Sequence, residues 1–313
     1  MRKFLGLNRV CVPLSLDCDL SCRYCYRARG RIPKVPEFND LMREFLGQLD
    51  PTKTQALVAS GGEPLLHWDK VKELFSYAPP NMHKKVMTNG LNLTQEIVDY
   101  FNENKIETWV SHDGDVTEWL RGVDVLNDPE LFNLIMQIEH LTFSCCCTAK
   151  NPDPWKCYEE IKARVPRHFY FHYNAVFTDN YLHPELIDGF DYKAFQAGAM
   201  RCDIADLDWT NPIPYGYRGT GCNVLPNGDL VGMAEIHHKY GTVLSTLEEV
   251  KATQKKWGDQ IPCDNETCPA HRTCRHQGQN RSPHFCECQI RGYTNRSTLR
   301  RLMQGKYDPE FDL

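Results

Sequence analysis

Short apolar runs alternate with amphipathic stretches over the first 200 residues, and this alternation constrains the fold more than any other feature. Runs rich in β-branched and aromatic residues predict strands at residues 10–16, 55–60, 84–88, 107–111, 141–147 and 168–176. Stretches with helical periodicity separate or follow them, at residues 39–49, 66–77, 94–104, 128–140, 153–165 and 184–199. Strands that alternate with helices in this way form βαβ units with a parallel sheet.

Six such units are two short of a closed (β/α)8 barrel, so we expect an open, partial (β/α)6 barrel. Its working residues should lie at the carboxyl ends of the strands. The pattern changes after residue 200, where Pro226, Asn227 and Gly228 predict a hairpin turn between short strands. A helix at residues 246–257 then precedes a cysteine-rich region. We therefore predict an α/β protein with a barrel domain at residues 1–200 and a small cysteine-rich domain at residues 201–313.

Composition excludes several classes of function. The formal net charge of −5 gives no basic field for nucleic acid, and no apolar run approaches the ~20 residues of a membrane span. The N-terminal apolar stretch is interrupted by Asn8, Arg9 and Pro13, so we interpret it as the first strand and not as a signal peptide. The 15 cysteines are odd in number, and eight of them cluster at residues 18–25 and 263–288. This clustering favours metal or iron–sulfur ligation in a reducing cytoplasm over disulfides.

The first cysteine cluster lies at the end of the first predicted strand, in the stretch LDCDLSCRYCYRARG. Cys18, Cys22 and Cys25 form a C-x3-C-x2-C pattern that can ligate three irons of a [4Fe–4S] cluster and leave the fourth iron open. Structural zinc normally takes four protein ligands, and no fourth Cys or His follows within the loop. A zinc site, a disulfide or buried free thiols are the alternatives.

With Tyr24 before the last cysteine, this loop resembles the signature of the radical S-adenosylmethionine (radical SAM) enzymes. Three further motifs follow in register at the ends of the next strands: SGGEP at residues 60–64, TNG at 88–90 and SHDG at 111–114. An Arg-Gly pair at residues 121–122 extends the last motif, an arrangement typical of family members that act on peptides. The resemblance covers residues 10–200.

The resemblance implies a cofactor and a reaction. The cluster on the three cysteines would bind the methionine end of S-adenosylmethionine, and its electron would release a 5′-deoxyadenosyl radical that abstracts hydrogen from the substrate. The implied cofactor-binding residues are Tyr24, Gly61, Gly62, Glu63, Pro64, Asn89 and Ser111. Asp113, at the end of the fourth strand, could act as a catalytic residue that takes a proton, or it could hold the turn.

The second cysteine cluster resembles the SPASM or twitch extension, which carries auxiliary iron–sulfur clusters in many peptide-modifying radical SAM enzymes. Met233 stands where the full pattern has a cysteine after Cys222, so only one auxiliary [4Fe–4S] cluster is expected. Its ligands would come from Cys263, Cys268, Cys274, Cys286 and Cys288, with Cys286, Cys288 or Cys222 as the fourth. A zinc knot using His271 or His276 is the alternative.

We therefore predict a radical SAM enzyme that modifies a peptide or protein, in the maturation of ribosomally made peptides. Cys18 lies too close to the N-terminus for a leader-binding domain in front of it, so either a separate protein binds the leader or the substrate is of another kind. Arginines at positions 23, 27, 29 and 31 suit an acidic flavodoxin- or ferredoxin-type reductant, and a solvated loop face is the alternative. The alternatives are a small-molecule radical SAM dehydrogenase and a non-catalytic iron–sulfur or zinc scaffold.

Overall fold

The structure, a computed structural model, describes residues 9–25, 38–49, 54, 56–175, 184–186, 188–205, 222–224, 229–231, 239–242, 244–245, 249 and 252–253. The chain divides into two compact units. The first comprises Met1–Ser111, Arg121–Thr142 and Gly219–Lys255, and the second comprises His112–Leu120, Phe143–Arg218 and Lys256–Leu313.

Parallel strands organise the first unit: β1 (Arg9–Ser15), β2 (Ala56–Gly61), β3 (His83–Thr88) and β4 (Glu107–Ser111). Their register pairs Val10 with Leu57, Leu57 with Lys84, and Lys85 with Glu107. The first residues of β5 (Leu141–Cys147) continue this order, and the N–H of Thr108 donates to the carbonyl of His140 at 2.9 Å.

The other edge of β1 is extended by three short strands, β7 (Cys222–Val224), β8 (Asp229–Val231) and β9 (Lys239–Thr242). β7 is parallel to β1, whereas β8 and β9 are antiparallel to their neighbours. The order in this unit is therefore β5-β4-β3-β2-β1-β7-β8-β9. The antiparallel β7–β8 pair agrees with the short strands expected here, and the predicted turn at Pro226, Asn227 and Gly228 lies outside the described residues.

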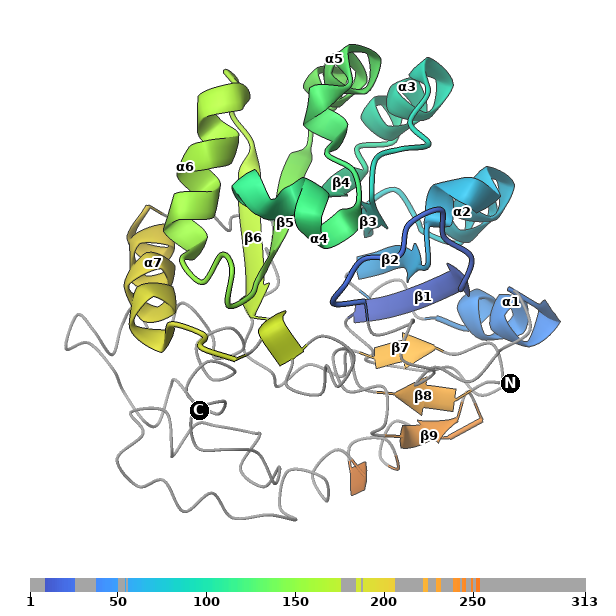
Figure 1. The fold of residues 1–313 in the computed structure, drawn as a ribbon. Coiled ribbons are helices and arrows are strands. Elements are labelled where there is room, and N and C mark those ends of the chain that lie inside the picture. Colours follow the sequence, from blue (N-terminus) through green and yellow to red (C-terminus); the bar gives the residue numbers. More distant parts are fainter. Residues whose placement is uncertain are drawn as a thin grey trace. The chain divides into compact units, whose positions relative to one another are not determined.

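Amphipathic helices flank these strands. They are α1 (Asp40–Gly47), α2 (Trp68–Ser76), α3 (Gln95–Glu103) and α5 (Pro129–Gln137), with single turns η2 (Pro64–His67) and η4 (Val125–Asn127). In Figure 1, α1, α2 and α3 lie along the same side of β1–β4. Their starts follow from sequence, because the side chain of Thr94 accepts from the N–H of Ile97 and that of Asp128 accepts from the N–H of Glu130. The apolar sides of the helices cover a strand core in which Leu57 and Val58 are fully buried.

An ion pair is buried between β3 and β4. Lys85 Nζ lies 3.2 Å from Glu107 Oε2 and 3.8 Å from the centre of the Trp109 ring, and both charged residues are at most 3% exposed. His83 and Trp109 also contact the Glu107 carboxylate. Burial alone would raise the pKa of Glu107, but Lys85 and these hydrogen bonds lower it below its usual range. Glu107 is therefore held as a carboxylate inside the protein.

In the second unit, the rest of β5 lies beside β6 (Tyr170–Ala175), and α6 (Pro154–Arg164) packs beside α7 (Tyr192–Ile204) (Figure 1). The ring of Tyr158 in α6 packs against those of Phe169 and Phe171, with ring centres 5.6 and 5.7 Å apart. The unit also contains η3 (Gly114–Val116), η5 (Pro184–Leu186) and most of α4 (Thr117–Arg121). Aromatic packing between strand and helix thus builds this core.

The predicted open, parallel α/β architecture is confirmed, since six strands follow one another in linear order from β1 to β6 without a closing pair between those two strands. Three cysteines, Cys11, Cys157 and Cys202, belong to the core, since each is at most 4% exposed. α7 runs past residue 200, and the division into domains at that position stays a prediction. Most of the predicted helix at 246–257 lies outside the described residues. No helix in the described parts of the chain is long and apolar enough to cross a membrane.

Candidate cofactor-binding site

The loop after β1 carries Cys18, Cys22 and Cys25, and all three thiols are half-buried and free of disulfides. Cys22 and Cys25 are joined by a tight turn, in which the N–H of Cys25 donates to the carbonyl of Cys22 at 2.9 Å. No three His, Cys, Asp or Glu side chains within the described ranges are arranged as a metal site. The fit to an iron–sulfur cluster therefore rests on the donor set, three thiols on one short loop, which is the ligand type such clusters use.

The glycine-rich stretch after β2 lies directly against the segment that leads into this cysteine loop. The N–H of Gly62 donates to the carbonyl of Ser15, and that of Glu63 donates to the carbonyl of Asp17, each at 2.7 Å. A Cβ on Gly62 would lie 1.9 Å from the Asp17 carbonyl oxygen, and Gly61 has φ +124. Two glycines are thus required here because the two backbones approach too closely for any side chain.

Glu63 is 1% exposed, and its carboxylate is bound within the protein. Oε1 accepts from the N–H of Leu65 at 3.0 Å and from the hydroxyl of Thr88 at 2.7 Å, and Oε2 accepts from the N–H of Asn89 at 2.7 Å. Burial outweighs these three hydrogen bonds and raises the pKa of Glu63 to about 7. Pro64, the next residue, starts η2, whose first turn the Glu63 side chain caps. Glu63 therefore joins the loop after β2 to the loop after β3.

Asn89, after β3, reaches the cysteine loop. Its Nδ2 donates to Asp19 Oδ1 at 2.6 Å and lies 4.0 Å from the sulfur of Cys18, while its Oδ1 accepts from the N–H of Leu91 at 2.9 Å. The predicted cofactor residues Gly61, Gly62, Glu63 and Asn89 are thus held around one end of the β1–β3 strands, together with Cys18. These contacts place them side by side, although each contact is made to protein.

Tyr24 and Arg121 form a further part of this site. The Arg121 guanidinium lies 5.2 Å from the centre of the Tyr24 ring, and Arg121 is only 8% exposed. Ser111, the last residue of β4, is half-buried. From the sequence, Arg121 and Gly122 were recognised only as part of a motif. The structure shows that Arg121 contacts Tyr24, the aromatic residue of the cysteine loop. A buried cation beside this loop suits an anionic group such as a carboxylate.

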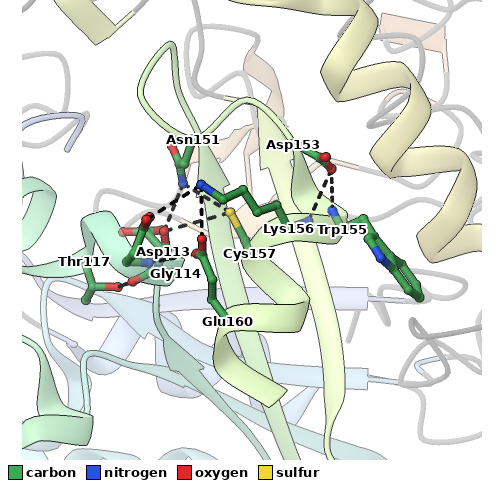
Figure 2. Close-up of polar contacts among 10 residues, drawn as sticks. Asp113, Gly114, Thr117, Asn151, Asp153, Trp155, Lys156, Cys157 and Glu160 are labelled. Atoms are coloured by element: carbon green, nitrogen blue, oxygen red, sulfur yellow. Dashed lines mark hydrogen bonds and ion pairs between the residues drawn. The ribbon is translucent and has the colours of Figure 1, made fainter. Parts of the chain in front are cut away.

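Asp113 lies in the second unit and is fully buried. Its Oδ1 accepts from the N–H of Cys146 at 2.7 Å, and its carbonyl accepts from the Asn151 amide at 3.1 Å (Figure 2). Its N–H donates to the Thr117 hydroxyl at 2.8 Å. These bonds fasten the loop after β4 to the loop after β5 and favour the turn-holding alternative. A catalytic role for Asp113 stays a prediction.

The predicted ligands of the auxiliary cluster, Cys263, Cys268, Cys274, Cys286 and Cys288, all lie outside the described residues. Cys222 falls in β7, next to β1. Of the three consecutive cysteines on β5, Cys145 and Cys147 are fully buried and Cys146 is half-buried, as expected where adjacent strand residues face opposite sides. Burial raises the pKa of Cys147 to about 12, so it behaves as an inert core thiol.

Comparison with solved structures shows a common fold. The chain is similar to anSMEcpe with bound AdoMet (TM-score 0.62, 15% identity, covering 95% of this chain and 98% of that one). It is also similar to anSMEcpe with bound AdoMet and Cp18Cys peptide (0.64, 15%, 96% and 99%). SuiB of Streptococcus suis bound to precursor peptide SuiA is a further likeness (0.56, 12%, 95% and 73%).

Curated relatives match a shorter segment. A putative glycyl-radical enzyme activating enzyme, MJ1227, of Methanocaldococcus jannaschii is 29% identical over 97 residues, which are 31% of this chain and 39% of the relative. The uncharacterized protein MJ0907 of the same organism is 24% identical over 114 residues, 35% of this chain and 40% of the relative. The chain thus matches about two fifths of the length of these relatives.

A protein-family model matches the first part of the chain. The model of the Radical SAM superfamily matches residues 12–118, which include the cysteine loop and the glycine-rich stretch against it. The same residues form β1–β4 and the loops at their ends, where the described site lies. Residues 12–118 are thus similar to the Radical SAM superfamily, and the chain shares its fold with the solved structures named above.

Proposed function

We propose that the protein is a radical SAM enzyme that acts on a peptide or protein substrate. The observation that carries the proposal is the pair of 2.7 Å hydrogen bonds that join the Gly62–Glu63 backbone to the segment leading into Cys18. They hold three thiols and the glycine-rich stretch at the same strand ends. When bound there, a [4Fe–4S] cluster and S-adenosylmethionine supply the electron and the 5′-deoxyadenosyl radical for hydrogen abstraction.

The residues of the first unit have distinct tasks in this proposal. Cys18, Cys22 and Cys25 would hold the cluster as thiolates and leave one iron for the cofactor. The buried Arg121 would bind the carboxylate of the methionine end, and the Tyr24 ring beside it would cover the cofactor with an apolar surface. The glycines allow the cofactor to approach backbone without obstruction by side chains. The structure shows Glu63 bonded to Leu65, Thr88 and Asn89. That Glu63 also binds the ammonium group of the methionine end stays a prediction.

A peptide substrate is supported by two of the similar structures, which hold the Cp18Cys peptide and the precursor peptide SuiA. The auxiliary cluster expected at the C-terminal cysteines points the same way. An acidic flavodoxin- or ferredoxin-type protein would supply the electron, and a separate protein would present the leader of the substrate. The reaction would be the maturation of a ribosomally made peptide by crosslinking, epimerisation or oxidation.

Cofactor cleavage tests the first part of the proposal. Protein purified without oxygen and reduced with dithionite should convert S-adenosylmethionine to 5′-deoxyadenosine, measured by liquid chromatography and mass spectrometry. Replacing Cys18, Cys22 and Cys25 together by Ala should abolish the product, whereas Cys147→Ala, in the core, should keep it. Product formation at the wild-type rate in the triple variant would exclude the assignment.

Deuterium transfer tests the substrate class. Where a short reading frame beside the gene encodes a precursor peptide, the perdeuterated peptide should pass deuterium into 5′-deoxyadenosine when the enzyme abstracts hydrogen from it. The peptide without its leader, and a deuterated amino sugar, serve as controls. Transfer from the sugar and not from the peptide would favour a small-molecule dehydrogenase.

A further inference from the structure

Asp19, between the first two cysteines, connects the cysteine loop to a different part of the chain. Its Oδ1 accepts from Asn89 Nδ2 and its Oδ2 accepts from Asn92 Nδ2, each at 2.6 Å. Both donors come from the loop between β3 and α3, about 70 residues further along the chain. Because both oxygens of one carboxylate are used, the side chain of Asp19 has a fixed direction.

This orientation places the Asp19 carboxylate next to Cys18, one of the three proposed cluster ligands. Asp19 Oδ1 lies 3.8 Å from the sulfur of Cys18, and the Asn89 nitrogen bound to it lies 4.0 Å from the same sulfur. The orientation of the Asn89 amide is determined, because its oxygen accepts from the N–H of Leu91. The sulfur of Cys18 therefore has a negative carboxylate and an amide donor as close neighbours, and Asp19 holds that donor in place.

We infer that Asp19 is a positioning residue for the cluster: it fixes the loop of Cys18 to the loop after β3 and sets the charge beside one cluster ligand. The inference rests on the proposed function, which places a [4Fe–4S] cluster on this loop. Hydrogen bonds and nearby charge are among the features that set the reduction potential of such clusters.

The direction of the effect follows from charge. Reduction adds one electron to the cluster, and a carboxylate a few ångströms from a ligand sulfur opposes that addition. Removing the charge should therefore raise the potential. Asp19 is exposed, so solvent screens part of this effect, and we expect a change of about three- to tenfold in the ratio of reduced to oxidised cluster at a given applied potential. This ratio equals an upward shift of roughly 30–60 mV for one electron.

Two variants separate this role from a general effect of charge or folding. Asp19→Asn removes the charge and keeps an oxygen that can accept from Asn89. Asp17→Asn removes the same charge two residues earlier, where the carboxylate contacts His67 at 3.0 Å instead of a cysteine. Asp19→Glu keeps the charge at position 19. The potentials are measured by redox titration of the reconstituted proteins, followed by the EPR signal of the reduced cluster.

We expect Asp19→Asn to shift the potential upward, and both Asp17→Asn and Asp19→Glu to stay near the wild type. Added salt should reduce the shift of Asp19→Asn. An unshifted potential in Asp19→Asn, or equal shifts in the two Asn variants, overturns the inference. If Asp19→Asn takes up no iron while its apoprotein melts like the wild type and Asp17→Asn takes up iron, the positioning role is supported. Loss of the apoprotein fold overturns it. Absence of iron from the wild-type loop would refute the proposed function instead.

Discussion

Replacing Glu63 by Gln tests whether the buried side chain of Glu63, in the glycine-rich stretch, holds a proton in the folded protein. Glu63 is 1% exposed, and its pKa is raised to about 7 from an ordinary value of 4.5 because burial outweighs the hydrogen bonds from Asn89, Thr88 and Leu65. The folded protein therefore keeps this proton over a pH range in which the unfolded chain has released it.

The sign of the linkage follows from the two pKa values. Between about pH 4.5 and pH 7 the folded state binds more protons at Glu63 than the unfolded state, so this residue lowers stability as pH rises through that window. A shift of about 2.5 pKa units corresponds to about 3 kcal/mol, fully present above pH 7. Gln carries no charge and lacks this dependence. It also presents an NH2 where one oxygen accepted, which leaves a buried donor unsatisfied at a cost of about 1–3 kcal/mol.

We therefore expect Glu63→Gln to be less stable than the wild type at pH 5 by about 1–3 kcal/mol, and to approach or exceed it at pH 8. Urea unfolding of the apoprotein, followed by circular dichroism at pH 5, 6, 7 and 8, measures both curves. The difference between the two proteins cancels the other titrating groups. Glu73→Gln is a matched control, since Glu73 is a surface residue paired with Arg43 at 2.6 Å and should change stability by less than about 1 kcal/mol at every pH.

A constant separation between the wild-type and Glu63→Gln curves from pH 5 to pH 8 would refute this reasoning. It would mean that the folded protein does not hold a proton on Glu63, and that the hydrogen bonds outweigh burial. A separation that grows as pH rises would mean that the charged form is the stabilising one.

The remaining predictions concern backbone contact, buried charge and metal content. Gly62→Ala should lose about 1–3 kcal/mol in urea unfolding because its Cβ would meet the Asp17 carbonyl, whereas Gly47→Ala, with nothing within 4 Å, should be neutral or stabilising. Lys85→Met should lose about 3–5 kcal/mol by leaving the buried Glu107 carboxylate without its lysine partner, and adding Glu107→Gln should restore part of it in the same assay; an additive double variant would contradict the pairing. Elemental analysis should find about eight irons per chain, and about half in the triple cysteine variant, by the four-iron stoichiometry of each cluster. About four irons with one zinc would instead show a zinc knot at the C-terminal cysteines.

Local pattern was sufficient to predict the alternating strands and helices of the sheet from the sequence. The strands at residues 107–111 and 141–147 agree with β4 and β5 residue for residue, because β-branched and aromatic runs bounded by turn residues leave few other registers. Asp128 and Thr94 marked helix starts for a local reason, since each caps N–H groups two or three residues ahead. The cysteine spacing likewise specified three thiols on one loop, because that proximity is covalent.

Contacts between distant segments were decided only by the tertiary structure. The bonds from Asn89 to Asp19 and to Glu63 join loops that follow three different strands, and no local periodicity encodes which side chains meet there. The sequence assigned Glu63 to the cofactor by resemblance, whereas the fold shows its oxygens bound to Leu65, Thr88 and Asn89. The buried pair of Lys85 and Glu107 was equally invisible, since charged residues in a strand read as exposed until a parallel neighbour covers both. Burial and charge pairing are properties of packed strands and loops, so they arise only when the chain has folded.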